Sequence, residues 1–115
     1  MESLEGFYFD PLHGGCLRHI VVDSRREENT DQCYYTVWGV YGSDEVSKGK
    51  FWTAKIVLEK RVRFLGYQKM YVDFAGKEEI THGRQYRAKW WPRERRIKWQ
   101  DGNTWKKMFV HQRQF

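Results

Sequence analysis

The residues with the clearest chemical potential lie between positions 85 and 100, where tryptophans alternate with lysines and arginines. If residues 92–95 form a four-residue hairpin loop, the flanking segments pair as antiparallel strands and their side chains alternate between two faces. One face is then apolar and consists of Tyr86, Ala88, Trp90, Ile97 and Trp99. The opposite side, which we call the basic face, consists of Arg87, Lys89, Trp91, Arg96 and Lys98, with Gln100 beside them.

The same register predicts an electrostatic cost on the basic face. Lys89 lies opposite Lys98, and like charges directly opposite one another destabilise a sheet, so replacing either lysine should leave the fold unharmed or slightly more stable. An anionic partner would offset the repulsion, and the ring of Trp91 would offer a flat surface on which a base stacks, worth ~1–3 kcal/mol. The alternative is that Trp91 packs under a neighbouring loop or against Arg96, while the lysines are merely solvated.

The charge of the chain is divided unevenly along its length. The net charge is +6, yet residues 1–50 carry five Lys/Arg against nine Asp/Glu, whereas residues 51–115 carry sixteen against six. Such segregation is typical of proteins that attract polyanions or acidic partners, although a basic surface can also serve solubility. The candidate nucleic-acid-binding residues are therefore those of the basic face, Arg87, Lys89, Trp91, Arg96 and Lys98.

Nine short segments have strand character, and turn-forming residues separate them. They are 6–9, 17–22, 33–41, 51–59, 62–65, 70–74, 85–91, 96–100 and 104–110. We therefore expect a single all-β domain over residues 1–115, an antiparallel meander of eight or nine strands. It should close into a barrel, lipocalin-like or of another small type, or otherwise form a sandwich. Its interior is predicted to hold Trp38, Trp52, Ile56, Val72, Trp90 and Trp99.

A further tight turn is predicted at Asp101-Gly102-Asn103, because Gly and Asn both accept positive φ. A three-residue loop there would place Trp105 opposite Trp99 on the apolar side of the hairpin. We interpret the two indoles as part of the packing, with a carbohydrate-stacking platform as the alternative.

The residues around the first predicted turn could also do chemistry. His13, Cys16 and His19, with Cys33 as a fourth ligand, could hold a metal, and Asp10 with His13 could activate Cys16 as a nucleophile. We expect ordinary turn chemistry instead, because the His-x-x-Cys-x-x-His order matches no zinc-site pattern and the common catalytic motifs are lacking. No metal, cofactor or enzymatic activity is therefore predicted. Free thiols are expected, although a bridge between Cys16 and Cys33 is geometrically possible.

Short motifs along the chain carry a resemblance. GFYFDPLHG begins at position 6 and has the form G-x-Y-x-DP-x-HG, VDFAGK begins at position 72, and DGNTW, of the form DGN-x-W, begins at position 101. Together they resemble a small all-β family of uncharacterised eukaryotic, largely algal, proteins, over nearly the whole chain. The resemblance implies an all-β fold and no particular activity. The Gly-x-Tyr opening is also similar to the Gly-x-Trp start of lipocalin-like barrels.

From these features we expect a non-enzymatic binding module. Its basic face would bind a polyanion, above all single-stranded nucleic acid with little sequence preference. Two alternatives stay open: a small barrel that carries an enclosed apolar or sugar-like ligand, and a structural subunit that docks on an acidic protein. No apolar run is long enough to span a bilayer and the acidic N-terminus lacks a signal sequence, so we expect an intracellular protein, cytoplasmic or nuclear, without a membrane partner. The oligomeric state is not predicted.

Overall fold

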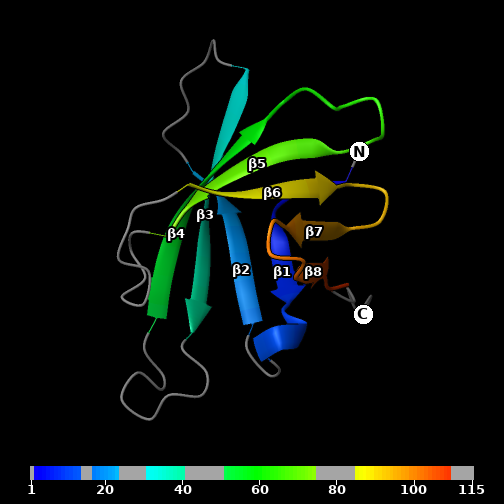
Figure 1. The fold of residues 1–115 in the computed structure, drawn as a ribbon. Helices are drawn as coiled ribbons and strands as arrows, with labels where there is room; N and C mark the ends of the chain where they lie inside the picture. Colours follow the sequence, from blue (N-terminus) through cyan, green and yellow to red (C-terminus); the bar gives the residue numbers. More distant parts are fainter. Residues whose placement is uncertain (1, 14–16, 24–30, 41–50, 75–84, 110–115) are drawn as a thin grey trace, which may run out of the picture.

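Eight antiparallel strands follow one another around a closed barrel in sequence order, and β1 closes on β8 (Figure 1). The structure, a computed structural model, describes residues 2–13, 17–23, 31–40, 51–74 and 85–109. The strands are β1 (Gly6–Phe9), β2 (Leu17–Val22), β3 (Gln32–Val40), β4 (Phe51–Glu59), β5 (Gln68–Asp73), β6 (Gln85–Trp91), β7 (Arg96–Trp99) and β8 (Thr104–Lys107). A short 3-10 turn, η1 (Pro11–His13), follows β1. Within the described ranges, no helix has the length and apolar character needed to cross a membrane.

The predicted all-β barrel is confirmed, and one of the nine predicted strands is wrong. Residues 62–65 belong to the turn between β4 and β5, whereas each of the other eight segments coincides with a strand within a few residues. Consecutive strands pair throughout, as expected for a meander. Closure of the barrel leaves no unpaired edge in this aromatic-rich chain, which removes a route to aggregation.

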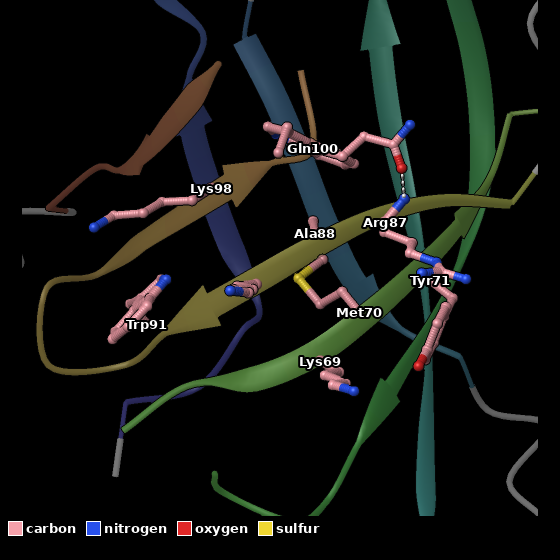
Figure 2. A pocket seen from close by; sticks show the side chains of 10 residues that line it. Lys69, Met70, Tyr71, Arg87, Ala88, Trp91, Lys98 and Gln100 are labelled. Carbon is pink, nitrogen blue, oxygen red and sulfur yellow. Dashed lines mark hydrogen bonds between the residues drawn. The ribbon is translucent and has the colours of Figure 1, made fainter. Parts of the chain in front are cut away.

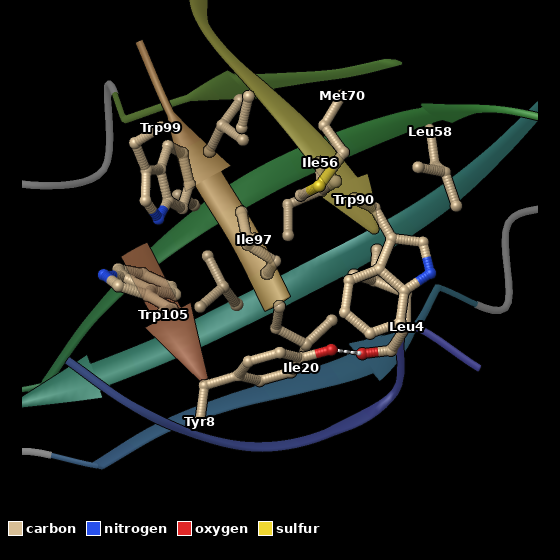
Figure 3. Close-up of a cluster of buried hydrophobic side chains, with 14 of the residues drawn as sticks. Leu4, Tyr8, Ile20, Ile56, Leu58, Met70, Trp90, Ile97, Trp99 and Trp105 are labelled. Atoms are coloured by element: carbon tan, nitrogen blue, oxygen red, sulfur yellow. Dashed lines mark hydrogen bonds between the residues drawn. The ribbon is translucent and has the colours of Figure 1, made fainter. Parts of the chain in front are cut away.

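The interior is built from residues at alternate positions of each strand. β4 shows this most clearly, because Trp52, Ala54, Ile56 and Leu58 are buried while the residues between them point outward. Large side chains with almost no exposure include Leu4, Tyr8, Ile20, Ile56, Met70, Trp90 and Ile97 (Figure 3). Full burial of one such side chain contributes roughly 1.5–3 kcal/mol, so this cluster is the main source of stability.

Trp38 is the only one of the six residues predicted for the interior that does not lie there. It is 45% exposed on the outer side of β3, whereas Val37 faces the core. Trp38 pairs with His19 of β2, which also points outward. The inward position next to it is Gly39, and a Cβ at this glycine would overlap the ring of Trp52. Because Trp52 fills the interior here, the register that places Gly39 inward is favoured and Trp38 is turned outward.

The N-terminal segment closes one end of the barrel. Leu4 is buried, and its carbonyl oxygen accepts a 2.6 Å hydrogen bond from the hydroxyl of Tyr8 (Figure 3). Burial raises the pKa of the Tyr8 phenol above its usual value, so the hydroxyl stays a donor. Lys107 of β8 donates to the carbonyl oxygen of Ser3 at 2.6 Å and pairs with Glu2 at 2.9 Å. The hydrogen bond from Lys107 lowers the pKa of the Glu2 carboxyl.

A buried ion pair occupies the opposite end of the barrel. Asp10 and Arg18 pair at 3.4 Å, and the side-chain amide of Asn103 donates to Asp10 at 3.0 Å. The guanidinium of Arg18 lies over the rings of Trp52 and Trp105, 5.1 and 5.6 Å from their centroids. Buried charges are tolerated when they are paired and hydrogen-bonded, and these contacts supply both. They join the β1–β2 link to the β7–β8 turn.

The turn between β7 and β8 differs from the prediction in its register. Trp105 lies opposite Ile97 rather than Trp99, because the loop spans residues 100–102 and the N–H of Trp99 donates to the carbonyl of Asn103 at 2.8 Å. A shift of two residues keeps every side chain on its face, so Trp105 still points inward. Its ring lies 4.7 Å from that of Trp99, edge to face, and the two indoles are part of the packing.

Candidate polyanion-binding face

The β6–β7 hairpin has the predicted loop and the predicted faces. Trp91 pairs with Arg96, and the N–H of Arg95 donates to the carbonyl of Pro92 at 3.2 Å to close the turn. The apolar side is buried, apart from a partly exposed Tyr86, and forms part of the barrel interior. On the outer side, Trp91 is half-buried, and the predicted site cations are all exposed: Arg87, Lys89, Arg96 and Lys98. The structure therefore brings the five predicted site residues together on one wall of the barrel.

Strand pairing brings a further lysine to this wall. Lys69 of β5 lies opposite Lys89 of β6, and Lys89 lies opposite Lys98 of β7. We call these three the lysine row; neighbouring strands in it are about 4.8 Å apart. Lys69 was not predicted as a site residue, because the strand was expected to begin at residue 70, whereas β5 begins at Gln68, and because its partner strand was not assigned. The signal that could have found it is the meander itself, in which consecutive strands pair.

The lysine row crosses an open pocket of about 420 Å³ on the outer wall (Figure 2). Of the residues that the structure describes, no Asp or Glu lines this pocket, and four of the lining side chains are cations: Lys69, Arg87, Lys89 and Lys98. A neighbouring pocket on β3, β4 and β5, of about 390 Å³, is lined by Asp23 and Asp73 as well as Lys55. A concave surface lined by charges of one sign concentrates counter-ions, and of these two pockets the first has this property in its described lining.

The two lysines that were expected to repel one another lie over different aromatic rings. The ammonium nitrogen of Lys98 lies 4.8 Å from the ring centroid of Trp91, and that of Lys89 lies 4.6 Å from the ring centroid of Tyr67. The two rings are in contact, with centroids 5.1 Å apart. Lys98 also pairs with Glu94 at 3.1 Å. Each exposed cation–π contact contributes ~0.5–1 kcal/mol, which offsets part of the repulsion expected between Lys89 and Lys98.

Trp91 combines features of both sequence-based hypotheses. Tyr67, which follows the β4–β5 turn, covers part of its ring, and its indole N–H is buried without a hydrogen-bond partner. The side chain still borders the pocket, as Figure 2 shows. The ammonium group of Lys98 lies over the ring, and the Lys98 side chain is itself partly exposed.

Backbone contacts hold the end of the basic face. The N–H of Arg87 donates to the side-chain oxygen of Gln100 at 2.9 Å (Figure 2), and the N–H of Gln100 donates to the carbonyl of Arg87 at 3.0 Å. Arg96 lies opposite Lys106 of β8, which adds a cation to the same wall. Within the described ranges, five cations of this wall make no ion pair: Lys69, Arg87, Lys89, Arg96 and Lys106. Their charge is available to an anionic partner.

Among the residues considered for metal binding or nucleophilic chemistry, the structure describes the side chains of Asp10, His19 and Cys33. Asp10 belongs to the buried ion pair, and Cys33 is a free thiol. His19 stacks on Phe7, with ring centroids 4.1 Å apart. Cys16 and the side chain of His13 lie outside the described part of the chain, and inside it no three His, Cys, Asp or Glu side chains gather as metal ligands would.

No protein-family model, curated protein or solved structure matches this chain. The resemblance of its motifs to a small all-β family therefore stays a prediction. The function of the basic face has to be inferred from its own geometry and charge.

Proposed function

We propose that the protein is a non-enzymatic binding module that holds single-stranded nucleic acid on the basic face. The observation that carries this proposal is the lysine row on three adjacent strands, beside the contacting rings of Tyr67 and Trp91. A phosphate backbone offers regularly repeated anions to such a row, and its bases offer flat surfaces to the rings. Cations interleaved with aromatic side chains are the usual features of surfaces that bind single strands.

Binding would exchange internal contacts for contacts to the ligand. A charge-assisted hydrogen bond to phosphate contributes ~1.5–3 kcal/mol, whereas an exposed cation–π contact contributes ~0.5–1 kcal/mol. We therefore expect Lys89 and Lys98 to turn from their rings to a phosphate when one arrives. This movement uncovers Tyr67 and Trp91, on which a base can then stack. Each neutralised phosphate also releases counterions, so the affinity falls as the salt concentration rises.

Sequence preference should be slight. The described part of the chain contains no α-helix that could read base edges in the major groove, and stacking on aromatic rings accepts any base. A curved barrel wall also suits a flexible single strand better than a duplex, which resists bending over ~50 nm.

Two other functions are less well supported: a carrier of an enclosed ligand, and a subunit that docks on an acidic protein. A carrier needs an internal cavity, but packed side chains such as Met70, Trp90 and Ile97 fill the described interior. An acidic protein would pair with the same cations, but it has no bases to stack on the rings of Tyr67 and Trp91. These observations favour a ligand on the outer wall, and nucleic acid over an acidic protein.

Fluorescence anisotropy with a labelled oligothymidylate of about 16 nucleotides tests the proposal. Lys89→Ala and Lys98→Ala should each weaken binding at low salt. Each should also reduce the slope of log affinity against log salt by about 0.7, the value for one phosphate contact on a single strand. Lys55→Ala is the matched control, because Lys55 lies on the outer side of β4 and contacts Thr36 and Asp23.

Three results would overturn the proposal. The first is a folded wild type that ignores single-stranded DNA and RNA at low salt. The second is an equal loss of affinity in Lys55→Ala and Lys89→Ala. The third is binding to polyglutamate as tight as to oligothymidylate, which would assign the basic face to acidic proteins. A small apolar or sugar-like ligand that perturbs tryptophan fluorescence independently of salt would favour the carrier.

A further inference from the structure

The turn between β4 and β5 presents two large apolar side chains to solvent. Phe64 is fully exposed and Leu65 is 70% exposed. They are the central residues of a four-residue turn over positions 63–66, which usually favours Gly, Pro, Asn, Asp or Ser. We call Phe64 and Leu65 the apolar turn. Turn chemistry does not explain these residue types, and adjacent exposed apolar side chains are typical of interaction sites.

The exposure of the apolar turn is built into the backbone. The N–H of Gly66 donates to the carbonyl of Arg63 at 2.8 Å, and the N–H of Arg63 donates to the carbonyl of Tyr67 at 2.7 Å. Gly66 has φ +99°, a conformation that suits glycine. The guanidinium of Arg63 also pairs with Glu59 of β4 at 2.9 Å. These contacts hold the apex so that Phe64 points into solvent.

The apolar turn is connected to the basic face through Tyr67. This residue comes directly after Gly66, and its ring contacts Trp91 and lies under the ammonium group of Lys89. Lys69, the first member of the lysine row, follows two positions later. Exposed cations, Lys60 and Arg61, precede the turn on the other side. The apex therefore extends the same cationic and aromatic surface beyond the barrel wall.

We propose that the apolar turn is a second contact for the single strand, in which Phe64 stacks on a base and Leu65 packs beside it. This inference rests on the proposed function of the basic face. Apolar side chains such as Phe and Leu insert between bases in other nucleic-acid complexes, and unstacked bases of single strands accept aromatic partners. The strand would run along the lysine row and then pass over the apex of the turn.

A flexible strand fits this arrangement better than a lipid surface does. The lysine row crosses three strands of the barrel wall, about 10 Å from Lys69 to Lys98 at ~4.8 Å per strand, whereas Phe64 lies at the apex of the turn beyond the wall. A flat bilayer that received Phe64 would not follow the wall from Lys69 to Lys98, and lysines that lie farther from a surface than the Debye length of about 8 Å at physiological ionic strength interact only weakly with it. A single strand can bend and touch both.

The test compares Phe64→Ala with Phe51→Ala, an equally large side chain that is 71% exposed on another part of the wall. Phe64→Ala should lower the affinity for oligothymidylate about tenfold, whereas Phe51→Ala should not change it. With an abasic oligomer of the same length, Phe64→Ala and the wild type should bind equally. Lys89→Ala should weaken binding to both ligands, because it removes a phosphate contact. A fluorescent base analogue within the oligomer should report stacking with the wild type and less of it with Phe64→Ala.

The possible failures are distinguishable. If Lys89→Ala weakens binding and Phe64→Ala does not, the inference about the apolar turn is wrong and the function of the basic face stands. If the wild type does not bind oligothymidylate, both are wrong. Vesicles of phosphatidylserine and phosphatidylcholine in equal parts provide the third arm. Binding to them that needs Phe64, without any effect of Phe64 on oligothymidylate, would assign the turn to a lipid surface instead.

Discussion

The basic face and a second region both lie on the outer side of the barrel strands, but the first is cationic and the second is apolar. The second region, which we call the apolar wall, lies on β1 to β4 and borders an open pocket of about 440 Å³. It consists of Phe7, Leu17, His19, Trp38 and Phe51. Among the described residues, no Lys or Arg lines its pocket, whereas four cations line the pocket of the basic face. On the apolar wall the rings are exposed, and on the basic face ammonium groups cover them.

This difference shows that the barrel fixes which side chains point outward, but not whether those side chains are charged or apolar. Phe7, His19 and Trp38 are paired in register across β1, β2 and β3, in the same way as the lysine row is across β5, β6 and β7. Strand pairing therefore places outward residues of the same kind side by side, either charged or aromatic. Since outward residues contribute little to the core, their types can be adapted to a ligand at small cost in stability.

The largest effect is expected for Gly39→Ala, which disturbs the side of the barrel that carries the apolar wall. The added Cβ overlaps the ring of Trp52, and overpacking of this kind costs ~1–3 kcal/mol. Urea denaturation should show this loss, while the folded fraction keeps its affinity for oligothymidylate. Unchanged stability would mean that Trp52 can move aside, and that the outward position of Trp38 has another cause.

A pair of tryptophan variants tests whether the two regions differ in function. Trp91→Ala should weaken oligothymidylate binding by roughly tenfold, because stacking contributes ~1–3 kcal/mol, and should leave the salt slope almost unchanged. Trp38→Ala removes the exposed tryptophan of the apolar wall. It should leave the affinity within about twofold, since we expect no base to stack on that wall. Anisotropy titrations measure both, and equal losses would abolish the distinction between the regions.

The lysines of the basic face should have small and unequal effects on stability. Lys98→Ala removes the contact with Trp91 and the pair with Glu94, so we expect a loss of up to ~1 kcal/mol in thermal unfolding. Lys89→Ala loses only the contact with Tyr67 and should stay within ~0.5 kcal/mol of the wild type. This replaces the sequence-based expectation that either variant is unharmed or more stable. A clear gain in stability would show that repulsion outweighs the ring contacts.

The smallest effect on stability is expected for the pair of Glu2 with Lys107, a lysine that points inward, unlike those of the lysine row. The pKa of Glu2 lies below 4.5 because Lys107 donates a hydrogen bond to it. A carboxyl with a lowered folded-state pKa stabilises the fold above its unfolded pKa and loses this contribution as pH falls through the folded pKa. Denaturation of the wild type and of Glu2→Gln should be compared at neutral pH and at a pH below the folded pKa. On acidification the wild type should lose at most ~0.5 kcal/mol more of its free energy of unfolding than Glu2→Gln, because Glu2 is partly exposed. A larger loss in Glu2→Gln on acidification would contradict this assignment.

The sequence by itself determined the features that depend on neighbouring residues. Alternation in the segments around Ile56 and Trp90 predicted strands with one buried face, and the turn residues between segments predicted an antiparallel meander. Pro92 and the residues after it defined the hairpin loop, which in turn predicted that Lys89 lies opposite Lys98. These are local properties, so a single stretch of chain contains all the information they need.

Only the tertiary structure decided which side chains gather and which way ambiguous segments face. Lys69 joins the basic face because β5 pairs with β6 in one register, and that register involves residues far apart in the chain. Trp38 faces outward because Trp52 takes the space beside Gly39, a competition that no local pattern reveals. Phe64 lies at an exposed turn although its segment has strand composition, because β4 and β5 must reverse there to pair. In each case the outcome depends on contacts between strands, and composition and alternation within one strand do not contain it.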